Sequence, residues 1–510
     1  MIRVAGISAA LCLFVGAALG TVPSAAQPAG TLTVALETEL APIDPVKDVA
    51  VLSTVTALRH IFDPLVDLTP EGEFVPRLAE SWERPDELTW IFKLRQNARF
   101  HDGTPVTAAD VAATILVLRD GRYSISQLWT VLESAEAIDD HTLRLVTKNP
   151  VATMLYAAAL VFPAPAAHFE ETKYIAGGNI IGSGPFRVES FRPDDALVML
   201  ANEDYWGAVP KVEKLVLREI PEMTAKLTAL RTGEIDIVVQ LPGSQLKLLE
   251  NDPSIRIMTE ISYGIYCNWM NNNVDHRLLG GPADRNPFAD VRVRKAMWHA
   301  VNTKLIADTL MKGTAVESRG PVTSSVSGYS EQPPYEYDPE KARRLLAEAG
   351  YPDGFNTSIM LTSTYIENLS YAFAMISDWA AIGVNVQPVE LEYSTWNERL
   401  RASEFDMALF PNFAYTGDAE WSIGRLYVTN NKRLGYSNAR VDDLVQQGRS
   451  ETDPDKRAAI YKEINQIIWD EAPSMWPLQL LVNYAVRDRV QDFVPAPSQI
   501  PDFRSVSVTN

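Results

Sequence analysis

The side chains best suited to nucleophilic or metal chemistry in this sequence are its histidines and one internal cysteine. A thiolate beside an imidazole could attack a carbonyl carbon, and two imidazoles one helical turn apart could bind zinc. The histidines are His60, His101, His141, His168, His276 and His299. No two of them are three or four residues apart, and Cys267 lies in an apolar strand pattern typical of a buried, inert thiol. We therefore expect no catalytic residue, no metal site and no cofactor.

Sequence motifs for phosphate binding and ester hydrolysis are also missing. The glycine-rich segment 182–191, GSGPFRVESF, lacks the Lys-Ser or Lys-Thr pair that completes a phosphate-binding loop. No Gly-x-Ser-x-Gly nucleophile elbow occurs in the sequence. The sequence favours a binding protein over an enzyme, with an exported peptide hydrolase as the lower alternative.

Residues 1–26 have the layout of a secretory signal peptide. Arg3 is their only charged residue, an apolar run follows it, and small residues precede Gln27. The run is nearly long enough to span a bilayer, so a membrane anchor is the alternative. Cleavage after Ala26 leaves Cys267 as the only cysteine, so the exported chain must fold without an internal disulfide. We expect a periplasmic protein that is not inserted in the membrane after cleavage.

Charge and length narrow the function further. The formal net charge is −19, and removal of Arg3 makes it more negative by one. A chain this acidic repels nucleic acid backbones and anionic lipid headgroups, so neither is an expected partner. At 510 residues the chain exceeds the size of a single hydrophobic core, which indicates two or three domains.

Helix and strand patterns alternate along the chain. Residues 31–37 and 89–95 alternate apolar and polar side chains, as half-buried strands do. Thr107 and Asp110 have the spacing of a capping box before a helix. Residues 337–355 contain the clearest helix, with an aspartate cap, proline at its first position and glycine beyond its end. The alternation predicts an α/β protein of at least two lobes.

Eight segments together resemble one protein family, the family 5 solute-binding proteins of dipeptide and oligopeptide ABC importers. The segments are 61–83, 92–111, 182–193, 202–220, 230–238, 286–306, 337–355 and 405–410. Each alone is only a turn, a strand or a helix cap. Their order and spacing both agree with the family over nearly the whole chain.

The resemblance implies the large, type II periplasmic-binding-protein fold: two α/β lobes, a subdomain inserted in the first lobe, and a hinge of two crossing strands. The implied divisions are 28–62, 181–262 and 480–510 for lobe I, 63–180 for the inserted subdomain, and 263–479 for lobe II. Two short adjacent strand segments, near 261–263 and 478–480, would absorb the rotation between lobes.

The implied function is capture of a di- or oligopeptide between the lobes and its delivery to an inner-membrane ABC permease. Because the ligand bridges both lobes, it favours the closed form, which the permease recognises. The protein is expected to act as a monomer. An oligosaccharide, an opine or a nickel complex is the alternative ligand in the same role.

The resemblance also indicates one site residue, Asp418 in the stretch NFAYTGDAEW. Peptide binders of the family carry an aspartate after a small pair such as Thr416 and Gly417, and it binds the ligand's α-ammonium group. The sequence departs from the family pattern at 419–421, which leaves the ligand class open. A second interpretation of Asp418 is that it stabilises the loop, as aspartate after glycine often does.

Other predicted site residues are aromatic or charged side chains near the same loops and the first strand. Pockets favour aromatic walls with a few polar groups. The aromatic candidates are Tyr415 and Trp421 first, then Trp396 and Trp269, of which Trp269 has the pattern of a core residue; about two of the four are expected to face the cleft. Arg319 is the candidate for a ligand carboxylate, and the alternative is a solvated surface arginine. Glu37 and Thr38 follow the first strand, where ligands of α/β lobes bind.

Overall fold

The computed structural model describes residues 28–36, 40, 43–47, 49, 51–70, 72–121, 123, 125–170, 180–281, 285–362 and 367–509. The predicted signal peptide and two predicted cleft residues, Glu37 and Thr38, lie outside these residues. Within the described part of the chain, no helix has the length and apolar character needed to cross a membrane.

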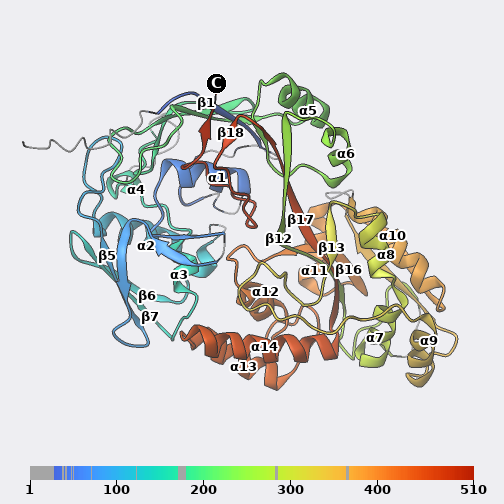
Figure 1. The fold of residues 1–510 in the computed structure, drawn as a ribbon. Helices are drawn as coiled ribbons and strands as arrows, with labels where there is room; N and C mark the ends of the chain where they lie inside the picture. Colours follow the sequence, from blue (N-terminus) through green and yellow to red (C-terminus); the bar gives the residue numbers. More distant parts are fainter. Residues whose placement is uncertain are drawn as a thin grey trace, which may run out of the picture.

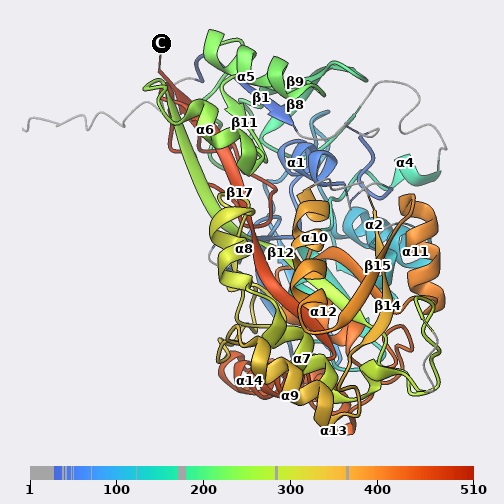
Figure 2. The same ribbon diagram turned by 90° about the vertical axis from the view of Figure 1, so that its right-hand side faces the viewer.

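A mixed sheet of eleven strands runs through both lobes, in the order β15-β14-β16-β12-β17-β11-β1-β10-β9-β8 with β13 beside β17 (Figure 1). Its two longest strands, β12 (Ile255–Met270) and β17 (Ser474–Arg487), pair antiparallel and pass from one half of the molecule to the other (Figure 2). Their register shifts between Ile261 and Ile265. This irregularity falls in the segment where the sequence predicts the hinge.

The first lobe is built on one end of this sheet. Its strands are β1 (Thr31–Leu36), β8 (Phe186–Arg192), β9 (Ala196–Ala201), β10 (Lys214–Glu219) and β11 (Ile237–Val238), with helices α1 (Leu52–Ile61), α5 (Met223–Thr232) and α6 (Leu246–Leu249) and the 3-10 helix η2 (Gly243–Gln245). The pair β18 (Val490–Gln491) with β19 (Ser507–Val508) completes it, and the hairpin β2 (Val66–Leu68) with β3 (Phe74–Pro76) falls within residues 63–180 predicted for the insert.

The inserted subdomain is a four-stranded antiparallel sheet in the order β4-β5-β7-β6. Its strands and helices are β4 (Ala79–Glu83), β5 (Thr89–Leu94), α2 (Ala108–Asp120), the 3-10 helix η1 (Ser126–Leu128), β6 (Leu132–Asp139), β7 (Thr142–Thr147), α3 (Met154–Ala158) and α4 (Ala167–Glu170). Helix α2 begins at the predicted capping box, in which Thr107 and Asp110 bond each other's backbone N–H groups. The local prediction of this helix is confirmed.

The second lobe packs its helices on the other end of the long sheet. Its strands are β13 (Ala315–Glu317), β14 (Phe355–Leu361), β15 (Val384–Glu390) and β16 (Met407–Phe413). Its helices are η3 (Pro287–Ala289), α7 (Val291–Ala300), α8 (Thr303–Thr309), α9 (Pro339–Glu348), α10 (Glu367–Ala380), α11 (Tyr393–Ala402), α12 (Ala419–Leu426), α13 (Ala439–Ser450) and α14 (Pro454–Glu471). Helix α9 has the predicted Asp338 cap and Pro339 at its first position.

Each lobe has its own hydrophobic core. The buried residues of the second-lobe core run from Tyr263 to Leu478. Those of the first lobe and its insert come from residues up to Ile255 and from Val482 onward. Two α/β lobes joined by two crossing strands confirm the predicted fold class, while the residue boundaries of the lobes stay a prediction.

Candidate ligand-binding cleft

A cavity of about 330 Å³ lies between the two lobes, at the hinge. The first lobe contributes α1 and the segment 494–505, and the predicted insert contributes β2 and α3. The second lobe contributes Tyr415 and Thr416, which follow β16, and Tyr263 of β12 lies beside the hinge. The volume is within the range of about 300–1,000 Å³ that is usual for small-molecule sites.

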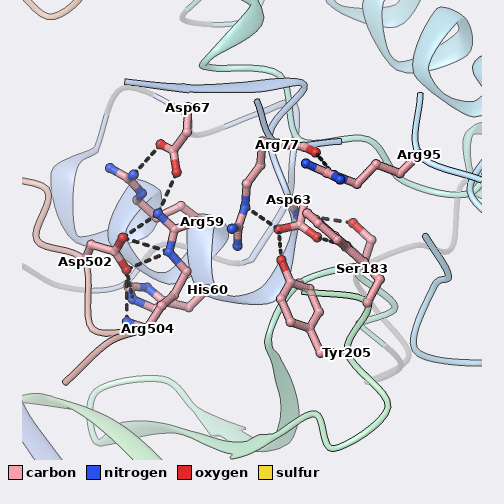
Figure 3. A network of polar contacts seen from close by, with 12 residues as sticks. Arg59, His60, Asp63, Asp67, Arg77, Arg95, Ser183, Tyr205, Asp502 and Arg504 are labelled. Carbon is pink, nitrogen blue, oxygen red and sulfur yellow. Dashed lines mark hydrogen bonds and ion pairs between the residues drawn. The ribbon is translucent and has the colours of Figure 1, made fainter. Parts of the chain in front are cut away.

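Four charged side chains form one wall of the cavity (Figure 3). A nitrogen of Arg59 lies 2.6 Å from one oxygen of Asp67, and a nitrogen of Arg504 lies 2.5 Å from the other. Arg504 also binds Asp502 through its Nε, at 2.7 and 2.8 Å from the two carboxylate oxygens. We call these four residues the charged wall; it holds two cations and two anions and has no net charge.

Electrostatic coupling keeps the charged wall ionised. Burial alone would raise the pKa of Asp67 and of Asp502, but the neighbouring guanidinium groups outweigh burial and hold both pKa values below their usual range. Both carboxylates are therefore ionised at neutral pH. The wall can present positive and negative charge to one ligand at the same time.

His60 fixes the charged wall to the rest of the lobe. Its Nδ1–H donates to the carbonyl of Thr56 at 2.6 Å, and its Nε2 accepts from the backbone N–H of Phe503 at 2.9 Å. Because that backbone group can only donate, Nδ1 carries the proton of the neutral ring. Burial lowers the pKa of His60 to about 4, although nearby Asp502 opposes this shift. A neutral imidazole thus ties α1 to the C-terminal segment that carries Asp502 and Arg504.

A second network beside the charged wall is structural (Figure 3). The fully buried Asp63 accepts hydrogen bonds from Tyr205 at 2.7 Å and Trp206 at 2.8 Å, and Arg77 pairs with it at 2.8 Å. None of these four residues lines the cavity. They join the segment that follows α1 to the loop between β9 and β10.

A smaller cavity of about 180 Å³ adjoins the first. Tyr415, Thr416 and three apolar residues line both. Trp421, on α12, lines only the smaller one, and its ring stands edge-on to that of Tyr415 at 6.2 Å between centroids.

Asp418 has partners within its own lobe. Its carboxylate is fully buried and binds both terminal nitrogens of Arg457 on α14, at 2.6 and 2.7 Å. It also caps α12 by accepting from the N–H of Glu420 at 2.8 Å. Asp418 is not a lining residue of either cavity. This geometry favours the loop-stabilising interpretation, and its role as an ammonium anchor stays a prediction.

The family is decided by comparison with known proteins. The model of the bacterial extracellular solute-binding proteins, family 5 middle region, matches residues 73–433. The chain belongs to this family. The predicted family is confirmed, and its members are substrate-binding components of ABC importers.

Relatives match this family 5 protein over nearly its whole length. It is 28% identical over 476 residues to the glutathione-binding protein GsiB of Escherichia coli O1:K1 / APEC, with 90% of each chain covered. It is 26% identical over 488 residues to heme-binding protein A of Haemophilus influenzae, covering 88% of this chain and 87% of the relative. The solved structure of the periplasmic binding protein DppA of Helicobacter pylori in complex with the peptide STSA is similar, with 25% identity and a TM-score of 0.74 over 94% of this chain and 98% of DppA.

Four further predicted site residues of this family 5 protein that the structure describes line neither cavity: Trp269, Trp396, Arg319 and Gly417. Trp269 and Trp396 are buried in the second-lobe core, with their ring centroids 5.9 Å apart. Arg319 is half-buried in the segment that follows β13 and pairs with Glu331 at 3.1 Å. Gly417 supplies the left-handed turn (φ +74°) between Thr416 and Asp418. Of the nine predicted residues, the cavities bring together Tyr415 and Trp421.

The sequence analysis did not predict the charged wall. One signal was present, since Arg59 is the first charged residue of α1 and follows a stretch of uncharged residues. Asp67, Asp502 and Arg504 lie in short hairpins and loops without a periodic pattern, and only the fold brings them beside α1.

The described residues give no support for metal chemistry. They contain no group of three or more histidines, cysteines, aspartates or glutamates placed to hold a metal ion. Cys267 is fully buried 3.6 Å from the hydroxyl of Tyr427, and burial raises the pKa of its thiol.

Proposed function

We propose that this family 5 protein captures a short peptide, or a zwitterion of similar size, in the interlobe cavity and delivers it to an inner-membrane ABC permease. The observation that carries the proposal is the charged wall, which offers both signs of charge at one side of the cavity. A peptide has an ammonium group and a carboxylate, and buried charges of a ligand need partners of opposite sign.

Within the wall, Arg59 is the proposed partner of the ligand carboxylate. A guanidinium group has five N–H donors in a planar fork. Arg504 uses its donors on two carboxylates, whereas the ion pair of Arg59 is with Asp67 through one nitrogen. A carboxylate entering the cavity can therefore share Arg59 with Asp67.

Asp502 is the proposed partner of the ligand ammonium group. Its side chain is 37% exposed, against 10% for Asp67. An ammonium group can reach Asp502 without breaking its ion pair with Arg504. We therefore place both ligand charges on the first lobe and assign Asp418 to the structure of the second.

The ligands of relatives and the cavity volume support a short peptide. One relative is named for glutathione, which is itself a tripeptide, and a solved relative holds the peptide STSA. A cavity of about 330 Å³ is near the lower end of the usual range for ligand sites, which favours a short peptide over a long one. Tyr415 and Thr416 would contact the ligand from the second lobe and so couple binding to closure.

The test is a pair of peptides that differ only in the amino-terminal charge. Calorimetric titration should show that a dipeptide or tripeptide binds roughly tenfold or more tightly than its N-acetylated form, because acetylation removes the positive charge that pairs with Asp502. Asp502→Asn should reduce that ratio to nearly one. Asp418→Asn is the matched control and should keep the ratio, whatever it does to stability.

Two results would contradict the proposal. If Asp418→Asn abolishes the affinity ratio between the free and the N-acetylated peptide and Asp502→Asn keeps it, the ligand ammonium group binds Asp418 and not Asp502. If native mass spectrometry shows that the gently purified protein releases an oligosaccharide, an opine or a nickel complex, the transport role stands and a peptide is excluded as the ligand.

A further inference from the structure

The smaller cavity differs from the larger one in chemistry. Its ten lining residues are Val49, Leu52, Val55, Ile125, Leu128, Leu160, Tyr415, Thr416, Trp421 and Ile500. None of them is charged, and seven are aliphatic. The four members of the charged wall line only the larger cavity. We propose that the smaller cavity is a specificity pocket for a bulky apolar side chain of the ligand; this inference rests on the proposed peptide function.

Helix α1 sets the distance between the charged wall and the apolar lining of the smaller cavity. Leu52, Val55 and Arg59 are spaced by three and four residues, so they share one face of the helix. At 1.5 Å per residue, Val55 lies about 6 Å and Leu52 about 10 Å along the axis from Arg59. An extended peptide advances about 3.5 Å per residue. If the peptide runs along α1 from a terminal charge held at Arg59, a side chain one or two residues away lies about 3.5 to 7 Å along the axis, beside Val55, and a long side chain there extends toward Leu52.

The volume of the smaller cavity suits one apolar side chain. A protein cavity of about 150 Å³ lined by aliphatic side chains holds benzene. At about 180 Å³, this cavity has room for the side chain of leucine or phenylalanine. A charged side chain would enter a space without an ionic partner and pay the cost of desolvation. The pocket should therefore select by polarity as well as by size.

Both lobes contribute to the pocket. Leu52 and Val55 belong to the first lobe and Leu128 to its insert, while Trp421 and Tyr415 belong to the second lobe. An apolar side chain in the pocket removes water from surfaces of both lobes at once. Occupancy of the pocket should therefore raise the affinity for the ligand and also favour the closed form.

The test is a calorimetric comparison of two dipeptide sets, Ala-Xaa and Xaa-Ala, with Xaa as alanine, leucine, phenylalanine or lysine. Each buried CH₂ is worth roughly fourfold in affinity. In one of the two sets, leucine or phenylalanine should bind at least tenfold more tightly than alanine, and lysine should bind more weakly than leucine.

Leu128→Asp, which places a carboxylate in the wall of the pocket, should reverse the preference between leucine and lysine. Leu116→Asp is the matched control: Leu116 is also a half-buried leucine packed on the first-lobe core, but it does not line the pocket. In Leu116→Asp, the ratio of the affinities for the leucine and lysine dipeptides should equal that of the wild type. Ratios measured within one variant are insensitive to a general loss of stability.

The outcomes separate this inference from the proposed function. If peptides bind and neither set distinguishes leucine or phenylalanine from alanine by threefold, the specificity pocket is wrong and the peptide function stands. If Leu128→Asp keeps the wild-type preference, the assignment of the pocket is wrong. If no peptide binds at all, the proposed function fails and the inference fails with it.

Discussion

Individual residues of the cleft are organised by charge pairing and by one neutral histidine. Arg504 and Arg59 together bind Asp67 and Asp502, so the wall is complete before a ligand arrives. His60 supports it by bonding to Thr56 on one side and Phe503 on the other. Protonation of Nε2 would replace the acceptor of the Phe503 N–H with a donor. The wall should therefore depend on His60 remaining neutral.

This gives a prediction for acid stability. The pKa of His60 is lowered from 6.5 to about 4, so the unfolded chain binds a proton at higher pH than the folded protein. The stabilising contribution is complete above pH 6.5 and is lost as the pH falls toward 4. Between pH 7 and 5, His60 alone should remove about 2 kcal/mol from the free energy of unfolding.

Urea unfolding at several pH values measures this loss. His60→Gln can keep one hydrogen bond but cannot be protonated, so its stability should fall less steeply over the same pH range. An identical pH dependence in His60→Gln and wild type would show that His60 does not cause the effect.

At the scale of single elements, the loop between β16 and α12 places the second lobe's part of the cleft. Gly417 adopts φ +74°, and a Cβ at this position would come within 3.1 Å of the hydroxyl of Tyr263. The next residue, Asp418, caps α12 and binds Arg457 on α14. This turn and these bonds direct Tyr415 and Thr416 into the cavity.

Gly417→Ala should therefore weaken ligand binding as well as stability. The left-handed backbone costs an alanine about 1–2 kcal/mol, and relief of the contact with Tyr263 would move the loop. Gly103→Ala is the matched control, because Gly103 has φ +88° with no neighbour within 4 Å of a Cβ. Thermal unfolding should show a loss in both variants, while calorimetry should show weaker ligand binding in Gly417→Ala only. Equal affinities in the two variants would refute the role of the loop.

At the scale of the whole molecule, the cleft is enclosed by contacts between the insert and the second lobe. The backbone N–H of Ala152 donates to the carbonyl of Arg449 at 2.5 Å. Tyr156 is buried near Asp418; burial raises the pKa of its phenol, and the carboxylate raises it further. Separation of these contacts would widen the cleft, because β12 and β17 connect the two lobes across the hinge.

Ligand should therefore make the protein more compact in solution. Small-angle X-ray scattering should give a smaller radius of gyration with a saturating peptide than without it, because the ligand binds the closed form more tightly than the open form. The N-acetylated peptide, at a concentration where it does not bind, should leave the radius unchanged. An unchanged radius with the bound peptide would exclude a population shift between open and closed forms.

Short stretches of sequence were enough to predict the local elements and the family. The cap of α2 at Thr107 and that of α9 at Asp338 depend on residues within one turn, so a short stretch of sequence is enough to predict them. The family followed in the same way from eight short segments in a fixed order. Each helix cap depends on neighbouring residues only, and the family assignment combines eight such short segments.

The tertiary structure alone decided which residues meet in the cleft. Arg59 and Arg504 lie at opposite ends of the chain, and both bind Asp67 only because β17 returns the chain to the first lobe. The same fold placed Trp269 and Trp396 in a core and gave Asp418 the partner Arg457. The free energy of a charged or aromatic side chain depends on its distant neighbours, which periodicity and spacing along the sequence do not contain.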